Sequence, residues 1–259
     1  MEIADRVVVV TGGARGIGRA MARRFATAGA ETVIVADVDA DGAWAVAREI
    51  GGMAIRCDVS NETEVAQLVE KVHIAKGRID VFCSNAGIGV GGGPETGNAD
   101  WQRIWEVNVM AHVYVARHTL PGMLARKEGY LLGTVSAAGL LNHIFAAPYG
   151  VTKAAALSLW EWLSIAHADD GIRVSCLCPQ GVKTEMLAAE RRQGLDFLTA
   201  TALEPDQVAE IVLQGLREEK FLILPHPEVA KYFSRKATDY DRWLKGMRRL
   251  RASILAASK

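Results

Sequence analysis

Tyr149 and Lys153 lie four residues apart in the stretch 149–168, whose alanine, leucine and tryptophan content predicts a helix. Side chains at this spacing share one face of a helix, so the phenol and the ammonium are expected to lie side by side. A phenol has an unperturbed pKa of about 10, and a neighbouring ammonium lowers that pKa because it stabilises the phenolate. The pair therefore predicts a group that carries a proton. On its own, the spacing also fits an ordinary surface pair.

Ser136 stands thirteen residues before Tyr149 and follows the apolar run 130–135, which predicts a buried strand. A hydroxyl at the end of such a strand can donate to a substrate oxygen on which negative charge develops. The sequence thus predicts a polar site between a strand end and a helix.

A glycine-rich segment near the start, containing Gly12, Gly16 and Gly18, predicts a second kind of site. The β-branched run 7–10 before it is typical of a central parallel strand, and the stretch 19–28 after it predicts a helix. Glycines in such a turn let a pyrophosphate approach the backbone, and the N–H groups at the helix start attract it. A purely structural turn is the alternative.

Asp37 follows the apolar strand 32–36 and lies nineteen residues beyond Gly18. A carboxylate at this position can accept hydrogen bonds from the adenosine ribose hydroxyls and would repel a 2′-phosphate, so it favours NAD over NADP. Arg15 is a basic residue in the glycine turn that would partly neutralise such a phosphate. The alternative role for Asp37 is to cap a helix over 39–50.

The remaining pattern predicts an α/β protein with a single-domain doubly wound, Rossmann-like sheet of about seven parallel strands and helices on both faces. With 259 residues, 50% of them hydrophobic, the chain can bury one large core, and we expect a single domain over 1–259. The predicted strands alternate with helical stretches and cover residues 6–10, 32–36, 53–57, 79–83, 130–135, 172–177 and 220–224.

Four further motifs follow these elements in order: Asp58-Val59, Asn85-Ala86-Gly87, Asn108, and a segment that contains Pro179, Val182 and Thr184. With them, residues 4–224 resemble the classical branch of the short-chain dehydrogenases/reductases. The resemblance implies a single catalytic set, in which Asn108 supports a proton-relay water. The implied catalytic residues are Asn108, Ser136, Tyr149 and Lys153.

The resemblance also implies which residues bind the cofactor, with Asp58 meeting the adenine amino group and Lys153 holding the nicotinamide ribose. The expected cofactor-binding residues are Gly12, Arg15, Gly16, Ile17, Gly18, Asp37, Asp58, Val59, Asn85, Ala86, Gly87, Tyr149, Lys153, Pro179, Val182 and Thr184.

The substrate is expected to lie under a lid at about 183–203, against mostly apolar side chains. Gln180 replaces a glycine of the family pattern, and its amide either enters the substrate site or turns outward. Residues near the lid and Tyr149 supply the remaining walls: Leu140, Leu141, Ile144, Phe145, Leu187, Phe197 and Leu198. The expected substrate-binding residues are Ser136, His143, Tyr149, Gln180 and Met186.

These features together predict an NAD-dependent oxidoreductase that interconverts a hydrophobic secondary alcohol and its ketone. One alternative is an NADPH-dependent reductase of ketone or acyl substrates. Another is an NAD-binding sensor or scaffold without turnover, because a fold alone does not imply catalysis.

Thirty basic and thirty acidic residues balance, which indicates neither a nucleic-acid partner nor a membrane partner. We expect a cytoplasmic protein without disulfides or a metal site, and a homodimer or homotetramer that pairs helices at 101–127 and 149–168. The divergent tail 225–259 carries a basic cluster, interpreted as a solvated helical face, with an anionic partner as the alternative. Its members are Arg242, Lys245, Arg248, Arg249 and Arg251.

Overall fold

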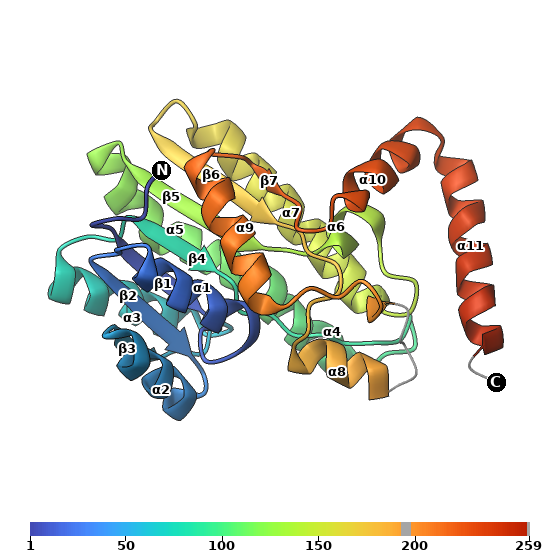
Figure 1. Cartoon of the computed structure of the whole chain (residues 1–259), viewed down its shortest axis with the longest axis horizontal. Coiled ribbons are helices and arrows are strands. Elements are labelled where there is room, and N and C mark those ends of the chain that lie inside the picture. Colours follow the sequence, from blue (N-terminus) through green and yellow to red (C-terminus); the bar gives the residue numbers. More distant parts are fainter. Residues whose placement is uncertain (193–197, 258–259) are drawn as a thin grey trace.

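A parallel sheet of seven strands forms the centre of the computed structural model, which describes residues 1–192 and 198–257 (Figure 1). The strand order is β3-β2-β1-β4-β5-β6-β7, and every pairing between named strands is parallel. The strands are β1 (Val7–Thr11), β2 (Thr32–Asp37), β3 (Met53–Arg56), β4 (Val81–Ser84), β5 (Gly129–Thr134), β6 (Ile172–Leu177) and β7 (Leu222–Ile223). The predicted fold class is confirmed, with strand ends shifted by one or two residues.

The valine run of β1 explains why this strand is central. Val7 and Val9 belong to one buried cluster, whereas Val8 and Val10 belong to a second cluster on the other face of the sheet. Side chains alternate between the faces of a strand, so a strand covered on both faces needs an uninterrupted apolar run.

Helices cover both faces of the sheet (Figure 1). The cluster around Val7 includes side chains of α3, α5 and α7, and the cluster around Val8 includes side chains of α1, α2 and α9. The α-helices that flank the sheet are α1 (Gly16–Thr27), α2 (Ala40–Ile50), α3 (Glu62–Lys76), α4 (Asn98–Trp105), α5 (Ala111–Arg126), α7 (Ala147–His167) and α9 (Pro205–Arg217).

Four shorter or peripheral helices complete the chain. α6 (Ala137–Leu141) and α8 (Glu185–Arg192) follow β5 and β6, and α10 (Glu228–Thr238) and α11 (Tyr240–Ala257) form the C-terminal part. Figure 1 shows α11 standing apart from the sheet, beyond α10. The basic residues of the tail are exposed on this helix, as a solvated face requires.

The predicted single helix over 101–127 is interrupted by a π-helical turn, Glu106–Met110. Asn108 in this turn is fully buried, accepts a hydrogen bond from the Ile88 N–H at 2.9 Å and donates one to the Ile88 carbonyl at 3.0 Å. These bonds hold Asn108 against the loop after β4. The wider turn fits the common use of π-bulges at functional sites.

The two tryptophans of α7 lie on different sides of the helix. Trp160 is fully buried against the sheet and adds nothing to the helix surface, whereas Trp162 is 59% exposed. Positions 160 and 162 are 200° apart around the helix axis at about 100° per residue, so one exposed helix face cannot hold both side chains.

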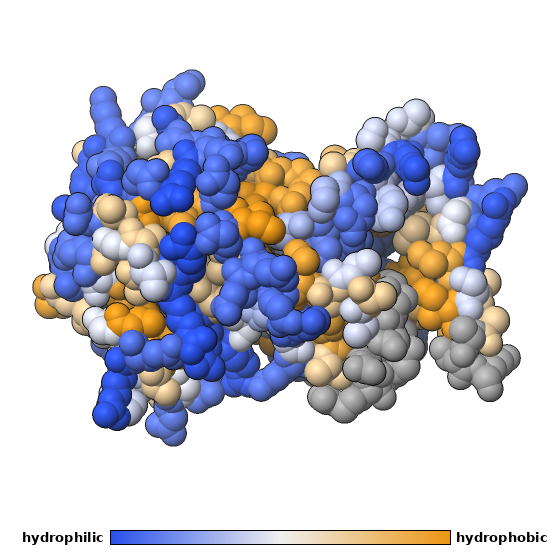
Figure 2. Space-filling view, viewed as in Figure 1, coloured by the Kyte–Doolittle hydropathy of each residue, from blue (hydrophilic) through white to orange (hydrophobic). Residues whose placement is uncertain are grey.

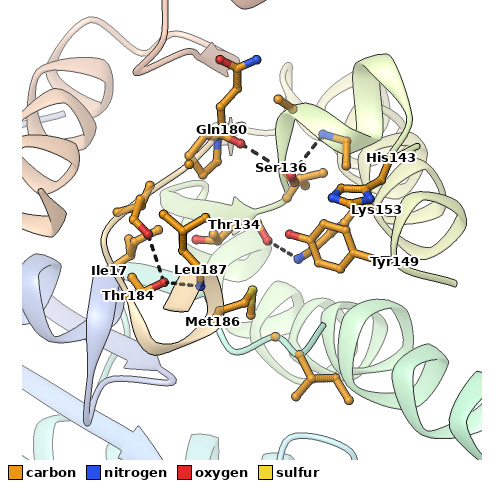
Figure 3. Close-up of a pocket in the computed structure, with 18 of the residues that line it drawn as sticks. Ile17, Thr134, Ser136, His143, Tyr149, Lys153, Gln180, Thr184, Met186 and Leu187 are labelled. Carbon is orange, nitrogen blue, oxygen red and sulfur yellow. Dashed lines mark hydrogen bonds between the residues drawn. The ribbon is translucent and has the colours of Figure 1, made fainter. Parts of the chain in front are cut away.

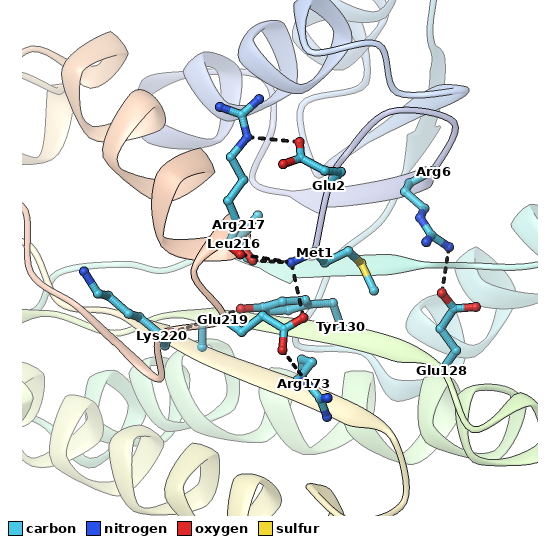
Figure 4. Close-up of polar contacts among 11 residues, drawn as sticks. Met1, Glu2, Arg6, Glu128, Tyr130, Arg173, Leu216, Arg217, Glu219 and Lys220 are labelled. Atoms are coloured by element: carbon cyan, nitrogen blue, oxygen red, sulfur yellow. Dashed lines mark hydrogen bonds and ion pairs between the residues drawn. The ribbon is translucent and has the colours of Figure 1, made fainter.

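At the amino ends of the strands, the N-terminus of the chain forms hydrogen bonds with the end of α9 and the segment that follows it (Figure 4). The Met1 ammonium donates to the Leu216 carbonyl at 2.7 Å and to the Glu219 carboxylate at 3.3 Å. Arg173 of β6 donates to the same carboxylate at 2.6 Å. This network stabilises the edge of the sheet away from the carboxyl ends. Within the described part of the chain, no helix has both the length and the apolarity needed to cross a membrane.

Candidate active site

A cavity of about 1130 Å³ lies at the carboxyl ends of the strands. Loops that follow parallel strands emerge at this edge, which is where open α/β sheets bind ligands. The cavity joins two parts, one lined by the glycine turn and Asp37, the other by Ser136, Tyr149 and Lys153. The two sites expected from the sequence are therefore one.

The glycine turn leaves room for a ligand only because side chains are missing from it. Gly12 has φ +64°, and a Cβ there would lie 2.9 Å from Ala86 Cα; a Cβ on Gly18 would lie 2.1 Å from the Gly12 carbonyl oxygen. Helix α1 begins at Gly16, three residues earlier than expected, and no described side chain caps its start. Its first N–H groups are thus available to an anion.

Asp37 faces this turn and is 8% exposed. Its carboxylate accepts hydrogen bonds from the N–H groups of Ala14 and Asp39, both at 3.0 Å. Asp39, which accepts from Gly42, is the residue that caps α2. The alternative assignment of Asp37 as the helix cap is therefore wrong.

Arg15 also lines the cavity, but acidic side chains already pair with it. Its guanidinium lies 2.8 Å from the Glu185 carboxylate and 3.2 Å from the Asp39 carboxylate. The hydrogen bond that Arg15 donates to the Glu185 carboxylate raises the pKa of Arg15. The positive charge is thus largely balanced within the protein.

Asn85, in the loop after β4, connects three strands. Its amide donates to the Thr11 carbonyl at 2.9 Å, and its side-chain oxygen accepts from the Thr134 hydroxyl at 3.0 Å. Asp58 accepts from the Ser60 N–H at 2.9 Å and hydroxyl at 2.7 Å. Both Asp58 and Asn85 line the cavity, as do Val59, Ala86 and Gly87.

Tyr149 and Lys153 project from α7 into the cavity (Figure 3). The Lys153 ammonium is 3% exposed, donates to the Thr134 carbonyl at 3.1 Å and lies 5.7 Å from the centre of the Tyr149 ring. Burial lowers the pKa of Lys153 to about 8. A buried ammonium beside a phenol stabilises the phenolate, which is the chemistry predicted from the four-residue spacing.

Ser136 is the N-cap residue of α6 and lies two residues after the end of β5. Its hydroxyl oxygen accepts from the Ala138 N–H at 3.0 Å and donates to the Pro179 carbonyl over 3.5 Å. The second contact is long, so the hydroxyl proton can turn to a stronger acceptor at little cost. Figure 3 shows Ser136, Lys153 and Tyr149 around one space.

Gln180 lines the cavity with its neighbours Pro179, Val182 and Thr184. In Figure 3 its side chain extends away from Tyr149. The backbone N–H of Gln180 donates to His226 Nδ1 at 3.2 Å.

Sequence reasoning did not identify the role of His226, which lies between Pro225 and Pro227. The ring is 3% exposed, and its Nε2 contacts the Thr201 carbonyl at 3.2 Å. Since Nδ1 accepts from Gln180, the proton is assigned to Nε2, which donates to Thr201. His226 therefore joins the loop after β6 to the end of the predicted lid. The two prolines that flank it were the only signal in the sequence.

Part of the expected substrate wall lies in the lining of the cavity. His143, Met186, Leu187 and Leu198 line the cavity, and the His143 ring meets the Tyr149 ring edge-on with centroids 6.0 Å apart. Burial lowers the pKa of His143, which favours the neutral imidazole.

Two expected wall residues lie elsewhere. Leu140 is 3% exposed within the core of the sheet, and Phe145 lies outside the cavity lining, with its ring under Arg251 at 5.5 Å. Phe197 lies outside the described residues. Leu141 and Ile144 from the same segment do line the cavity.

Residues from the C-terminal helices complete the wall, and sequence reasoning did not find them. They come from α10 and α11, which follow β7. These residues are Glu228, Tyr232, Arg235, Trp243, Met247 and Leu250.

A doubly wound parallel sheet with a glycine turn before its first helix defines a nucleotide-binding α/β protein. The family model for short chain dehydrogenases matches residues 6–194. The chain belongs to this family and is therefore an oxidoreductase by class.

Several named proteins resemble the chain over most of its length. A meso-2,3-butanediol dehydrogenase from Serratia marcescens is 34% identical over 221 residues, covering 82% of this chain and 87% of the relative. A 1-deoxy-11-beta-hydroxypentalenate dehydrogenase from Streptomyces exfoliatus is 35% identical, covering 88% and 86%. The crystal structure of a family member from Burkholderia phymatum in complex with NAD superposes with a TM-score of 0.86 at 29% identity, covering 93% and 96%.

Proposed function

We propose that this protein is an NAD-dependent dehydrogenase that interconverts a hydrophobic secondary alcohol and its ketone. The observation that carries the proposal is the buried Lys153 ammonium beside Tyr149, in the same cavity as the glycine turn. A protein that only bound a nucleotide could use the ammonium, but it would have no need of a phenol beside it together with Ser136 and Asn108. The relatives named for dehydrogenation of hydroxyl compounds agree with this class of reaction.

The residues of the turn fit a dinucleotide. Gly12 and Gly16 leave the space that a pyrophosphate would need, Asp37 would accept hydrogen bonds from the adenosine ribose, and Asp58 and Val59 would lie beside the adenine. Lys153 would hold the nicotinamide ribose, and Asn85, Ala86 and Gly87 would line the cavity beneath the cofactor. The nicotinamide side is bounded by Ile17, Pro179, Val182 and Thr184.

The hydride acceptor in the oxidation is supplied by the nicotinamide ring of bound NAD. Tyr149, as the phenolate, takes the hydroxyl proton of the alcohol while hydride leaves the same carbon, so a ketone forms. Lys153 keeps the phenolate stable, and Ser136 donates to the reacting oxygen. Asn108 supports the water that passes the proton to solvent. In ketone reduction the same residues act in reverse.

NAD is favoured over NADP by the charges around Asp37. A 2′-phosphate there would face this carboxylate, and the nearby Arg15 is already paired with Glu185 and Asp39. The NAD complex of the Burkholderia phymatum relative agrees with this choice.

A panel of alcohols tested with NAD and with NADP examines the proposal directly, with absorbance of the reduced nicotinamide as the readout. We expect faster turnover with NAD, and higher kcat/KM for an aryl or cycloalkyl secondary alcohol than for a sugar alcohol or a hydroxy acid. Faster turnover with NADP would favour the NADPH-dependent reductase. Nucleotide binding without turnover of any alcohol or ketone would make the protein a sensor or scaffold.

A further inference from the structure

Helix α11 carries an apolar stripe of three residues, Trp243, Met247 and Leu250, which we call the α11 stripe. The spacings of four and three residues place them on one face of the helix. All three line the same cavity as Tyr149. Figure 2 shows hydrophobic surface on this helix, on the side turned toward the body of the protein.

Two contacts connect α11 to the reacting centre. The Arg251 guanidinium lies over the Phe145 ring at 5.5 Å, and Phe145 belongs to the segment just before α7. In that segment His143 meets the Tyr149 ring edge-on at 6.0 Å. The helix is also held from its base, where Lys236 of α10 donates to the Leu140 carbonyl at 2.6 Å. The stripe is therefore positioned across the cavity from residues that contact Tyr149.

The stripe is only partly covered by protein. Trp243 is half-buried and packs against the core cluster around Val7, Met247 is half-buried, and Leu250 is 43% exposed. Leaving such a surface open to water is unfavourable, and an apolar surface that lines a binding cavity marks a ligand contact. The stripe from Trp243 to Leu250 spans about 10 Å, since a helix rises about 1.5 Å per residue.

We propose that the α11 stripe is the outer wall of the substrate site and binds the distal hydrocarbon part of the substrate. This inference rests on the proposed function and narrows its substrate class. The preferred alcohols extend well beyond the carbon that reacts, as fused-ring or long-chain secondary alcohols do. The wall lies beyond residues 6–194, the part matched by the family model, so it belongs to the divergent end of this chain.

The test compares cyclohexanol with decalol, whose fused second ring adds four apolar carbons. Burial of each methylene strengthens binding roughly fourfold, so wild type should use decalol with kcat/KM up to about 250-fold higher. Met247→Ser and Leu250→Ser, alone and together, should reduce this ratio, the double variant by about tenfold or more. Leu244→Ser is the matched control, because Leu244 is 48% exposed on α11 but does not line the cavity.

A binding measurement separates this inference from the proposed function. Calorimetric titration with decalone and cyclohexanone needs no turnover, and decalone affinity should depend on Met247 and Leu250 even if no alcohol were oxidised. If the double variant used both alcohols with an unchanged decalol to cyclohexanol ratio of kcat/KM, the role of the α11 stripe would be wrong, while the proposed dehydrogenase activity would remain supported. A change in oligomeric state with unchanged decalone affinity would also overturn it, and would make the stripe an interface between two copies of the chain.

Discussion

The Lys153 ammonium lies where little water can reach it, and burial of this charge lowers the stability of the folded protein. The ammonium is 3% exposed, and burial lowers its pKa from 10.5 to about 8. Its four-residue spacing from Tyr149 could be predicted from the sequence, because helix geometry alone fixes which side chains share a face. Its burial could not, because that depends on how β5 and α7 pack.

The cost of burying the Lys153 ammonium predicts how the free energy of unfolding depends on pH in the protein without cofactor. Below pH 8 folded and unfolded chains both carry the Lys153 proton, and the folded state bears the burial penalty. Between pH 8 and 10.5 the unfolded state binds more protons, so the free energy of unfolding should rise with pH through this window. Lys153→Met should be more stable than wild type at pH 7 by up to about 3 kcal/mol, with a smaller difference near pH 10.

Urea unfolding at pH 7 and at about pH 9.5 checks this prediction. A Lys153→Met variant that is less stable than wild type at both values would show that the charge is compensated in the fold. The same variant should lose turnover, since function and stability make opposite demands at this residue.

Asp37 is the residue at which cofactor choice can be altered. Replacing Asp37 by Ser removes the like charge, and replacing Val38, which is 58% exposed in the cavity wall, by Arg supplies a partner for a 2′-phosphate. We expect the NADP to NAD ratio of kcat/KM to rise by about tenfold or more in Asp37→Ser/Val38→Arg. Asp41→Ser is the matched control, because Asp41 is exposed nearby on α2 and does not line the cavity. Wild type that already prefers NADP would contradict the role of Asp37.

At the scale of elements, strands were easier to predict than the turns between them. The valine run of β1 and the glycine turn before α1 have strong local patterns, and both lie within three residues of their expected positions. The π-helical turn Glu106–Met110 has no such pattern. It is held by bonds between Asn108 and Ile88, twenty residues apart, which periodicity does not reveal. His226 was missed for the same reason, since its partners Gln180 and Thr201 come from other loops.

Helix α5 carries a histidine that should make the fold sensitive to acid. His112 is fully buried, its Nδ1 lies 2.7 Å from the Ser84 hydroxyl, and its ring meets Trp160 edge-on. Burial lowers the pKa of His112 from 6.5 to about 3. As pH falls below 6.5, His112 binds a proton in the unfolded chain but stays neutral in the folded protein, so the free energy of unfolding decreases on acidification.

The loss due to His112 should be about 2 kcal/mol at pH 5. We expect His112→Phe, which keeps a ring beside Trp160, to show a smaller fall in its urea midpoint between pH 7 and pH 5 than wild type. His167→Phe on α7, where the side chain is only partly buried, is the control, because it leaves the His112 ring in place. If the urea midpoint fell equally in wild type and in His112→Phe, groups other than His112 would be responsible for the acid sensitivity.

At the scale of the whole molecule, an exposed apolar face remains on α7. Val151 is 48% exposed, Trp162 59% and Ile165 83%, and their spacing places them on one side of the helix. The predicted pairing of this helix with the region 101–127 of a second copy would cover them across a two-fold axis.

We therefore expect a homodimer, or a tetramer built from such dimers. Trp162→Glu combined with Ile165→Glu should shift the protein toward monomers in light scattering. In the dimer, the introduced carboxylates would be buried and would face the same carboxylates of the second copy across the axis. Leu244→Glu on α11 serves as a control for surface charge. A wild-type protein that is monomeric at micromolar concentration and active would contradict this assembly.

The position of α10 and α11 shows the limit of sequence reasoning at this scale. Their helical pattern is readable, but nothing local shows that Trp243 and Met247 return to the cavity of Tyr149. The parallel sheet with helices on both faces, by contrast, could be predicted from the alternation of strands and helices along the chain.

The most direct test of the proposed reaction is the steady-state rate of Tyr149→Phe with a cycloalkyl secondary alcohol and NAD, measured beside its affinity for NAD. Phenylalanine keeps the ring against His143 and removes only the oxygen that carries the proton. We predict a loss in kcat of about a thousandfold or more, with NAD affinity within a few-fold of wild type. A variant that retains most of the wild-type rate at saturating alcohol would contradict the assignment of Tyr149 as the proton carrier.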